Sequence, residues 1–151
     1  MMKYYNYDIV FQEIPDEVTL AVNITNCPNR CPGCHSPHLW EDVGEPLTEE
    51  VLDALMARYG RLVTCVCFMG GDGRLAELER LALHLRRHYR VKTAWYSGQY
   101  ALPQHLELFD FVKTGPYLRE RGGLKSPGTN QRLYQVSRAD GTLRELFLHR
   151  R

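Results

Sequence analysis

The chain has 151 residues, of which 44% are hydrophobic, and this is enough apolar material for one core and too little for two ordinary domains. Lys and Arg number 19 against 18 acidic residues, so charge gives no reason to expect binding to nucleic acid or to an anionic membrane. No apolar run approaches the roughly 20 residues that span a bilayer, and the first ten residues carry no signal-peptide core, so we expect a cytoplasmic protein with one domain, residues 1–151.

The first predicted elements are two β-strands, separated by Pro15 and Asp16. The second, VTLAVN at 18–23, is apolar enough to be a buried strand. It leads directly into the segment CPNRCPGCH at 27–35, which is the most informative part of the sequence.

Three of the five cysteines crowd into that segment, which suits a metal site in a reducing compartment better than a disulfide framework. Cys27, Cys31 and Cys34 are separated by three and then two residues, so a tight loop can turn their thiolates toward one point, as three corners of an iron-sulfur cube require. Electron-transfer clusters take four cysteines. A cluster held by three would leave its fourth iron open to a small molecule.

A structural zinc site is the alternative for these cysteines. His35 or His38 would then complete a set of three thiolates and one imidazole, and the chain would be a zinc-binding interaction module instead of an enzyme. The flanking pattern favours the cluster, because a buried strand precedes the loop and a glycine-rich turn follows a second strand, and a zinc knuckle requires neither.

The rest of the chain alternates between helices and strands. Thr48 can cap an amphipathic helix that ends at Gly60, and the apolar run LVTCVCFM at 62–69 predicts a buried parallel strand. A second amphipathic helix follows over 75–89. The later predicted elements are strands at 92–96 and 109–113, a short helix at 103–108, and a solvated tail that includes Arg138, Arg144, Arg150 and Arg151. Contact with an acidic partner surface is the alternative for these arginines.

The turn Gly70-Gly71-Asp72 directly follows the predicted strand that contains Cys65 and Cys67. Two glycines let the backbone approach a ligand closely, although a double glycine after a strand is more often only a tight turn. Cys65 and Cys67 would share one face of the strand, and free cysteine is among the most buried residue types. We therefore expect core packing for this pair, with a second redox or metal site as the alternative.

The alternation of predicted strands and helices along the chain indicates an α/β fold with a mainly parallel sheet and a ligand site at the carboxyl ends of its strands. The cysteine spacing resembles the signature of the radical S-adenosylmethionine enzymes, and within them the chain is similar to the small glycyl-radical activating enzymes. The stretch SPGTNQR at 126–132 resembles the C-terminal part of the activators of anaerobic ribonucleoside-triphosphate reductase, which are the most similar group. The resemblance implies a partial (β/α)6-type barrel that is open on one side, since a full barrel needs roughly 200 residues or more.

The resemblance also implies a set of cofactors and the residues that bind them. Cys27, Cys31 and Cys34 would hold three irons of a 4Fe-4S cluster, whose fourth iron binds the amino and carboxylate groups of S-adenosyl-L-methionine. No side chain is assigned as a catalytic acid, base or nucleophile. The implied contacts to S-adenosylmethionine are Gly33, Cys34, His35, Gly70, Gly71, Asp72 and Ser97.

The implied reaction begins with one electron from a flavodoxin or ferredoxin type donor. Cleavage of S-adenosylmethionine would give methionine and a 5′-deoxyadenosyl radical, which would remove hydrogen from a glycine in the glycyl radical subunit of anaerobic ribonucleoside-triphosphate reductase. The alternative enzyme is a pyruvate formate-lyase type activator or another small radical S-adenosylmethionine enzyme.

Overall fold

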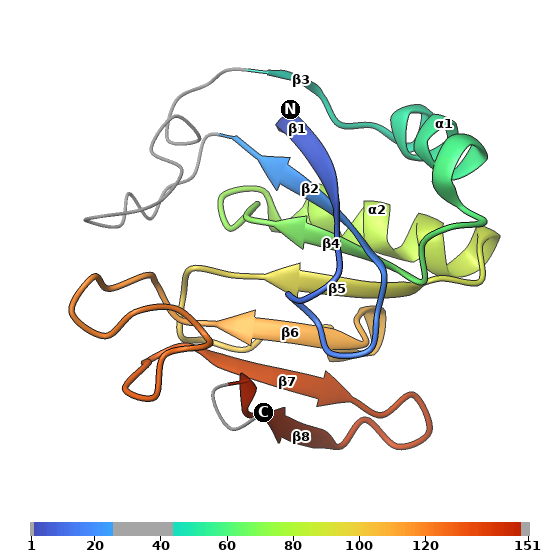
Figure 1. Ribbon diagram of the computed structural model, residues 1–151. Helices are drawn as coiled ribbons and strands as arrows, with labels where there is room; N and C mark the ends of the chain where they lie inside the picture. Colours follow the sequence, from blue (N-terminus) through green and yellow to red (C-terminus); the bar gives the residue numbers. More distant parts are fainter. Residues whose placement is uncertain (1, 26–43, 149–151) are drawn as a thin grey trace.

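The computed structural model describes residues 2–25 and 44–148. Within these ranges, eight strands form one mixed sheet with the order β3-β1-β2-β4-β5-β6-β7-β8 (Figure 1). The strands are β1 (Lys3–Val10), β2 (Thr19–Ile24), β3 (Glu45–Pro46), β4 (Cys65–Met69), β5 (Lys92–Tyr96), β6 (Phe111–Thr114), β7 (Arg132–Val136) and β8 (Leu143–Leu146). The helices are α1 (Glu49–Tyr59), α2 (Leu75–His88) and the 3-10 turn η2 (Leu106–Leu108).

The middle of the sheet is parallel and both of its sides are antiparallel. Strands β2, β4, β5 and β6 run in the same direction, β1 and β3 flank them on one side, and β7 and β8 on the other. The parallel register places Asn23, Met69, Tyr96 and Lys113 in one row. Because each of these residues lies at or near the carboxyl end of its strand, the turns that follow β4, β5 and β6 open at the same side of the molecule (Figure 1).

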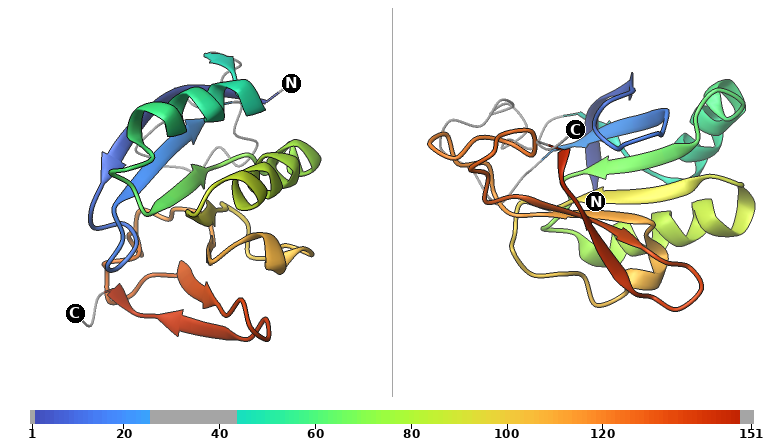
Figure 2. Two further views of the ribbon diagram at one scale, coloured as in Figure 1. Left: turned by 90° about the vertical axis from the view of Figure 1, so that its right-hand side faces the viewer. Right: turned by 60° about the horizontal axis from the view of Figure 1, so that its bottom comes forward.

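One face of the sheet, here called the helix face, packs against α1 and α2 (Figure 2). Helix α1 begins where Thr48 accepts a hydrogen bond from the backbone N–H of Val51 at 3.2 Å, the N-cap that the sequence predicts. Helix α2 buries an apolar stripe at helical spacing. The stripe and the strand residues packed in the same core include Leu78, Leu81, Leu85, Val22, Val66 and Phe68.

The opposite face, here called the inner face, carries a second core cluster that contains Cys65, Cys67 and Ala94. Residues 11–18, the connection between β1 and β2, pass in front of β5 and β6 on this face (Figure 1). Ile14 is fully buried in the cluster, and the hydroxyl of Tyr96 donates to a backbone carbonyl of the connection. The sequence predicted only a break between two strands here, whereas the folded connection covers part of the sheet.

Most of the predicted elements are confirmed, with shifts at their ends. The strand predicted at 62–69 begins at Cys65, because the backbone N–H groups of Leu62 and Val63 donate to Tyr59 and form a turn after α1. The strands β3, β7 and β8 were not predicted. The partial barrel stays a prediction: what is described is a mixed sheet with four parallel strands. No helix in the described ranges is long and apolar enough to cross a membrane.

Candidate functional site

Four of the predicted site residues belong to the described structure, and they lie together after β4 and β5. These are Gly70, Gly71, Asp72 and Ser97. The others lie outside the described residues: Cys27, Cys31, Gly33, Cys34 and His35, together with His38 of the zinc alternative.

The glycine turn after β4 requires glycine at both of its first positions. Gly70 and Gly71 have φ angles of 105° and 90°, in the region that favours glycine over residues with a side chain. A Cβ atom at Gly70 would lie 3.4 Å from the carbonyl oxygen of Ile24, and one at Gly71 would lie 3.4 Å from the Ile24 Cδ1. The turn therefore packs against the last residue of β2, the strand that precedes the cysteine segment in the sequence.

The carbonyl groups of this turn already accept hydrogen bonds within the fold. The Gly70 oxygen accepts from the indole Nε1 of Trp95 at 2.7 Å, and the Gly71 oxygen accepts from the backbone N–H of Arg74 at 3.0 Å. Trp95 is buried in the core, as predicted for a strand residue. Each carbonyl keeps a second lone pair, which is what the turn can offer to a ligand.

Asp72 and Ser97, both predicted to contact the cofactor, bind each other. The Ser97 hydroxyl donates to Oδ1 of Asp72 at 2.5 Å, and the backbone N–H of Gly98 donates to Oδ2 at 3.0 Å. The Ser97 Oγ in turn accepts from the backbone N–H of Gln99 at 3.0 Å. The side chain of Asp72 therefore joins the turn after β4 to the turn after β5.

Lys113 is a candidate site residue that sequence reasoning missed. It lies near the end of β6, and only 9% of its surface is exposed. Its Nζ donates to the carbonyl oxygens of Ser97 and Gly115 at 2.8 and 3.2 Å, and it lies 5.7 Å from the ring centroid of Tyr96. A buried ammonium group is costly unless it is hydrogen-bonded, and its place near the end of a central strand makes Lys113 a candidate for binding an anionic ligand group. The available signal was a lysine inside an otherwise apolar strand that ends at a turn.

The stretch around Asn130 packs against the turn that follows β6. A Cβ atom on Gly115 would lie 3.2 Å from the backbone carbonyl oxygen of Asn130 and 3.2 Å from the Gln131 Cα. Gly115 has a φ angle of 100°. The Asn130 Nδ2 donates to the Pro116 carbonyl at 3.0 Å and to the Tyr100 hydroxyl at 2.9 Å. The Asn130 Oδ1 is buried, and among the described residues it has no hydrogen-bond partner. An acceptor in that state is suited to a donor that is not part of the fold.

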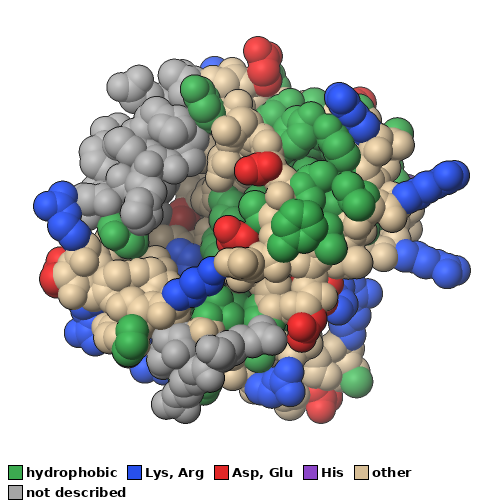
Figure 3. Space-filling view, viewed as in Figure 1, with side chains coloured by type: hydrophobic (Ala, Val, Ile, Leu, Met, Phe, Trp, Pro, Cys, Tyr) green, Lys and Arg blue, Asp and Glu red, His purple; other side chains and the backbone are tan. Residues whose placement is uncertain are grey.

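The four turns at 70–72, 97–100, 114–116 and 129–131 are here called the carboxyl edge. Lys113 and Asn130 add polar groups to it. Lys113 was found from the structure, whereas Asn130 lies in the stretch at 126–132 that the sequence analysis singled out, and the structure adds its buried acceptor. In the space-filling view, the inner face is hollowed toward this side, with hydrophobic, basic and acidic side chains in the hollow (Figure 3). The carboxyl edge therefore has the charge, the buried acceptor and the close backbone approach that a polar ligand requires.

Cys65 and Cys67 belong to the core, as predicted. Both are fully buried on the inner face, and burial is the main cause that raises the pKa of each thiol. Protonated buried thiols are poor metal ligands. In the described ranges, no group of three or more His, Cys, Asp or Glu side chains is arranged to hold a metal ion.

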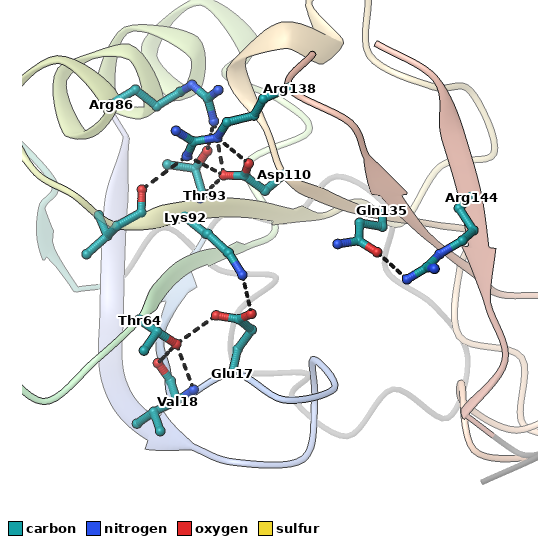
Figure 4. A network of polar contacts seen from close by, with 11 residues as sticks. Glu17, Val18, Thr64, Arg86, Lys92, Thr93, Asp110, Gln135, Arg138 and Arg144 are labelled. Atoms are coloured by element: carbon teal, nitrogen blue, oxygen red, sulfur yellow. Dashed lines mark hydrogen bonds and ion pairs between the residues drawn. The ribbon is translucent and has the colours of Figure 1, made fainter. Parts of the chain in front are cut away.

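Two polar networks away from the carboxyl edge hold the sheet together (Figure 4). In one, Glu17 accepts from the Thr64 hydroxyl at 2.7 Å and from the Lys92 ammonium at 2.6 Å. In the other, Asp110 lies between two arginines. A pocket of about 630 Å³ beside Glu17 and Lys92 is lined by the β1–β2 connection and by residues 144–148, and it contains no predicted site residue.

A family model described as a 4Fe-4S single cluster domain matches residues 17–117, which is more than half of the chain. The matched span contains the three cysteines, the glycine turn, Ser97 and Lys113. No curated protein and no solved structure matches the chain.

Proposed function

This chain belongs to the 4Fe-4S single cluster domain family, and from that premise we propose that it is a radical S-adenosylmethionine activating enzyme for anaerobic ribonucleoside-triphosphate reductase. The observation that carries the proposal is the three-cysteine motif inside the matched span, which leaves one iron of a 4Fe-4S cluster without a protein ligand. The family description is compatible with this chemistry and favours iron and sulfide over the zinc alternative.

Cys27, Cys31 and Cys34 are the residues that would hold the cluster. When bound, the cluster and S-adenosylmethionine supply a one-electron cleavage that leads to removal of a hydrogen atom from a glycine of the reductase. The three cysteines follow β2 in the sequence, and β2 ends beside the glycine turn of the carboxyl edge. This order along the chain supports a cluster next to the carboxyl edge.

The described residues fit a ligand that carries both a carboxylate and hydrogen-bond donors. Lys113 adds a buried positive charge next to the turn after β5, and a positive potential there favours a ligand that carries a carboxylate. The Asn130 Oδ1 offers an acceptor for an amine or a hydroxyl group. Gly70 and Gly71 leave space for close approach. The methionine end and the ribose of S-adenosylmethionine carry these complementary groups.

The protein partner would approach from the hollowed side of the inner face (Figure 3). A glycine buried in a reductase must be presented on a loop of backbone, and such a loop needs an accessible site. The hollow beside the carboxyl edge supports this mode of access. Flavodoxin or ferredoxin is proposed as the electron donor.

The test is electron paramagnetic resonance on oxygen-free protein mixed with a reductant, S-adenosylmethionine and the candidate reductase. We expect a glycyl radical signal on the reductase. Cys31→Ala should lose both the cluster and the signal, because a cluster held by two thiolates is not retained. Cys67→Ala, a substitution of a core cysteine, should keep both.

Two results would contradict the proposal. If metal analysis found one zinc ion per chain and no sulfide, the chain would be a zinc-binding interaction module and not this enzyme. A radical that forms on a pyruvate formate-lyase type partner, and not on the reductase, would keep the chemistry and change the substrate.

A further inference from the structure

We propose that Asp72 is a positioning residue, which sets the place of the Lys113 ammonium group through Ser97. The inference rests on the proposed function, because its consequence is measured on S-adenosylmethionine. It departs from the sequence prediction, in which Asp72 itself contacts the cofactor.

The first step is the bond between two turns. Both oxygens of the Asp72 carboxylate accept hydrogen bonds from the turn after β5, one from the Ser97 hydroxyl at 2.5 Å and one from the Gly98 backbone N–H at 3.0 Å. Hydrogen bonds to a charged acceptor are roughly twice as strong as those between neutral groups. Only 1% of the surface of Ser97 is exposed, so water is a poor substitute for Asp72 at this hydroxyl.

The second step is the bond between Ser97 and Lys113. The Ser97 backbone N–H donates to the Lys113 carbonyl at 2.8 Å, and the Lys113 Nζ donates to the Ser97 carbonyl at 2.8 Å. Ser97 therefore binds both residues: its hydroxyl donates to Asp72, and its carbonyl accepts from the ammonium group of Lys113. A shift of Ser97 would move its carbonyl oxygen, which is one of the two oxygens that accept a hydrogen bond from the Lys113 ammonium group.

The third step is the consequence for a ligand. Lys113 has a long side chain, and such side chains lose considerable rotamer freedom when they are fixed. With Ser97 and Gly115 holding the Nζ, that loss occurs on folding and not on binding. Loss of the Asp72 carboxylate would return freedom to the ammonium and weaken the binding of an anionic group.

The variant Asp72→Asn tests this step, because it keeps the shape of the side chain and removes its charge. We expect the dissociation constant of S-adenosylmethionine for the cluster-loaded protein to rise about tenfold, as for the loss of one charge-assisted hydrogen bond. The KM for S-adenosylmethionine should rise more than kcat falls, and the iron and sulfide contents should stay unchanged. In the protein without cofactors, amide hydrogen exchange at Gly98 and Gln99 should become faster.

Asp140→Asn is the matched control. The Asp140 carboxylate also accepts from one backbone N–H and one hydroxyl, both of Thr142, at 3.0 and 2.8 Å. It lies in the turn between β7 and β8, outside the carboxyl edge. Its substitution should leave binding unchanged.

A double-mutant cycle with Lys113→Gln separates positioning from direct contact. If Asp72 acts through Lys113, the double variant binds S-adenosylmethionine no more weakly than Lys113→Gln alone. Additive losses would show a direct contact of Asp72 and overturn the inference. Wild-type affinity in Asp72→Asn would overturn the inference and leave the proposed function standing, whereas a wild-type protein that does not bind S-adenosylmethionine would overturn both.

Discussion

At the scale of single residues, the position of a cysteine decides its chemistry. Cys65 and Cys67 alternate with Val66 on β4 and point to the inner face, where both are fully buried. Burial raises the pKa of each thiol, so neither is a thiolate near neutral pH. We therefore expect these two cysteines to act as core residues and to be unreactive while the chain is folded.

Thiol titration checks this assignment. A variant in which Cys27, Cys31 and Cys34 are replaced by Ser keeps only Cys65 and Cys67. We expect its folded form to react negligibly with a thiol reagent at neutral pH, and both thiols to react once the chain is unfolded in denaturant. Rapid reaction of the folded variant would show that these cysteines are accessible. It would favour the alternative that they form a second redox site.

At the scale of elements, Asp110, which directly precedes β6, joins α2, β5 and the turn that follows β7. Its carboxylate accepts from Arg138 at 2.6 Å, from Arg86 of α2 at 3.0 Å and from the backbone N–H of Thr93 of β5 at 2.9 Å. Arg138 follows β7, so the network attaches the β7–β8 hairpin to the rest of the sheet. Burial opposes ionisation of Asp110 most strongly, but the bonds from Arg138 and Thr93 and the nearby arginine charges outweigh it and lower the pKa.

Asp110→Asn should therefore destabilise the protein by about 2 kcal/mol, since hydrogen bonds to a charged group are lost. The lowered pKa means that the native state binds the proton of Asp110 more weakly than the unfolded chain. This stabilisation is present above the ordinary pKa of 3.8 and is lost as the pH falls through the lowered value. Denaturant unfolding of wild type and variant at pH 7 and at pH 3 measures it, and the difference between them should shrink at pH 3.

A control for this substitution lies in the same hairpin. Arg132 and Glu145 form an ion pair at 2.8 Å, and the side chain of Arg132 is 62% exposed. Exposed pairs contribute less than about 1 kcal/mol, so Glu145→Gln should have a much smaller effect. Equal losses for Asp110→Asn and Glu145→Gln would contradict the role of the buried network.

At the scale of the whole molecule, the β1–β2 connection closes part of the inner face. Ile14 packs among residues of β4, β5, β6 and β7, and the Lys125 ammonium contacts the Gln12 side chain at 2.8 Å. The Tyr96 hydroxyl donates to the carbonyl of Glu13. Residues distant in the sequence are therefore held on one surface by a connection that has no regular secondary structure.

Ile14→Ala should destabilise the protein by about 3 kcal/mol, because it removes apolar contacts and leaves a cavity in a packed cluster. Phe11→Ala, in the same connection, should change stability by less than about 0.5 kcal/mol, since the Phe11 side chain is 65% exposed. Thermal unfolding of both variants gives the comparison. A small effect at Ile14 would show that the connection does not contribute to the core.

Local patterns explain which elements could be predicted. The N-cap at Thr48, the apolar run before Gly70 and the stripe of α2 are each contained within a few neighbouring residues, and all three are observed. The β7–β8 hairpin was missed because its strands are short and carry many polar residues. Arg138 was expected in a solvated tail and instead binds Asp110, which precedes it by 28 positions.

The sequence by itself determined the cysteine motif, the succession of the central strands and helices along the chain, and the glycines after β4, because spacing and periodicity are local properties of the chain. Only the tertiary structure decided that Asp72 bonds Ser97, that Lys113 lies buried between two carbonyl groups, and that Asn130 packs against Gly115. These contacts join residues from different strands, and their partners depend on strand order and register, which no local pattern encodes.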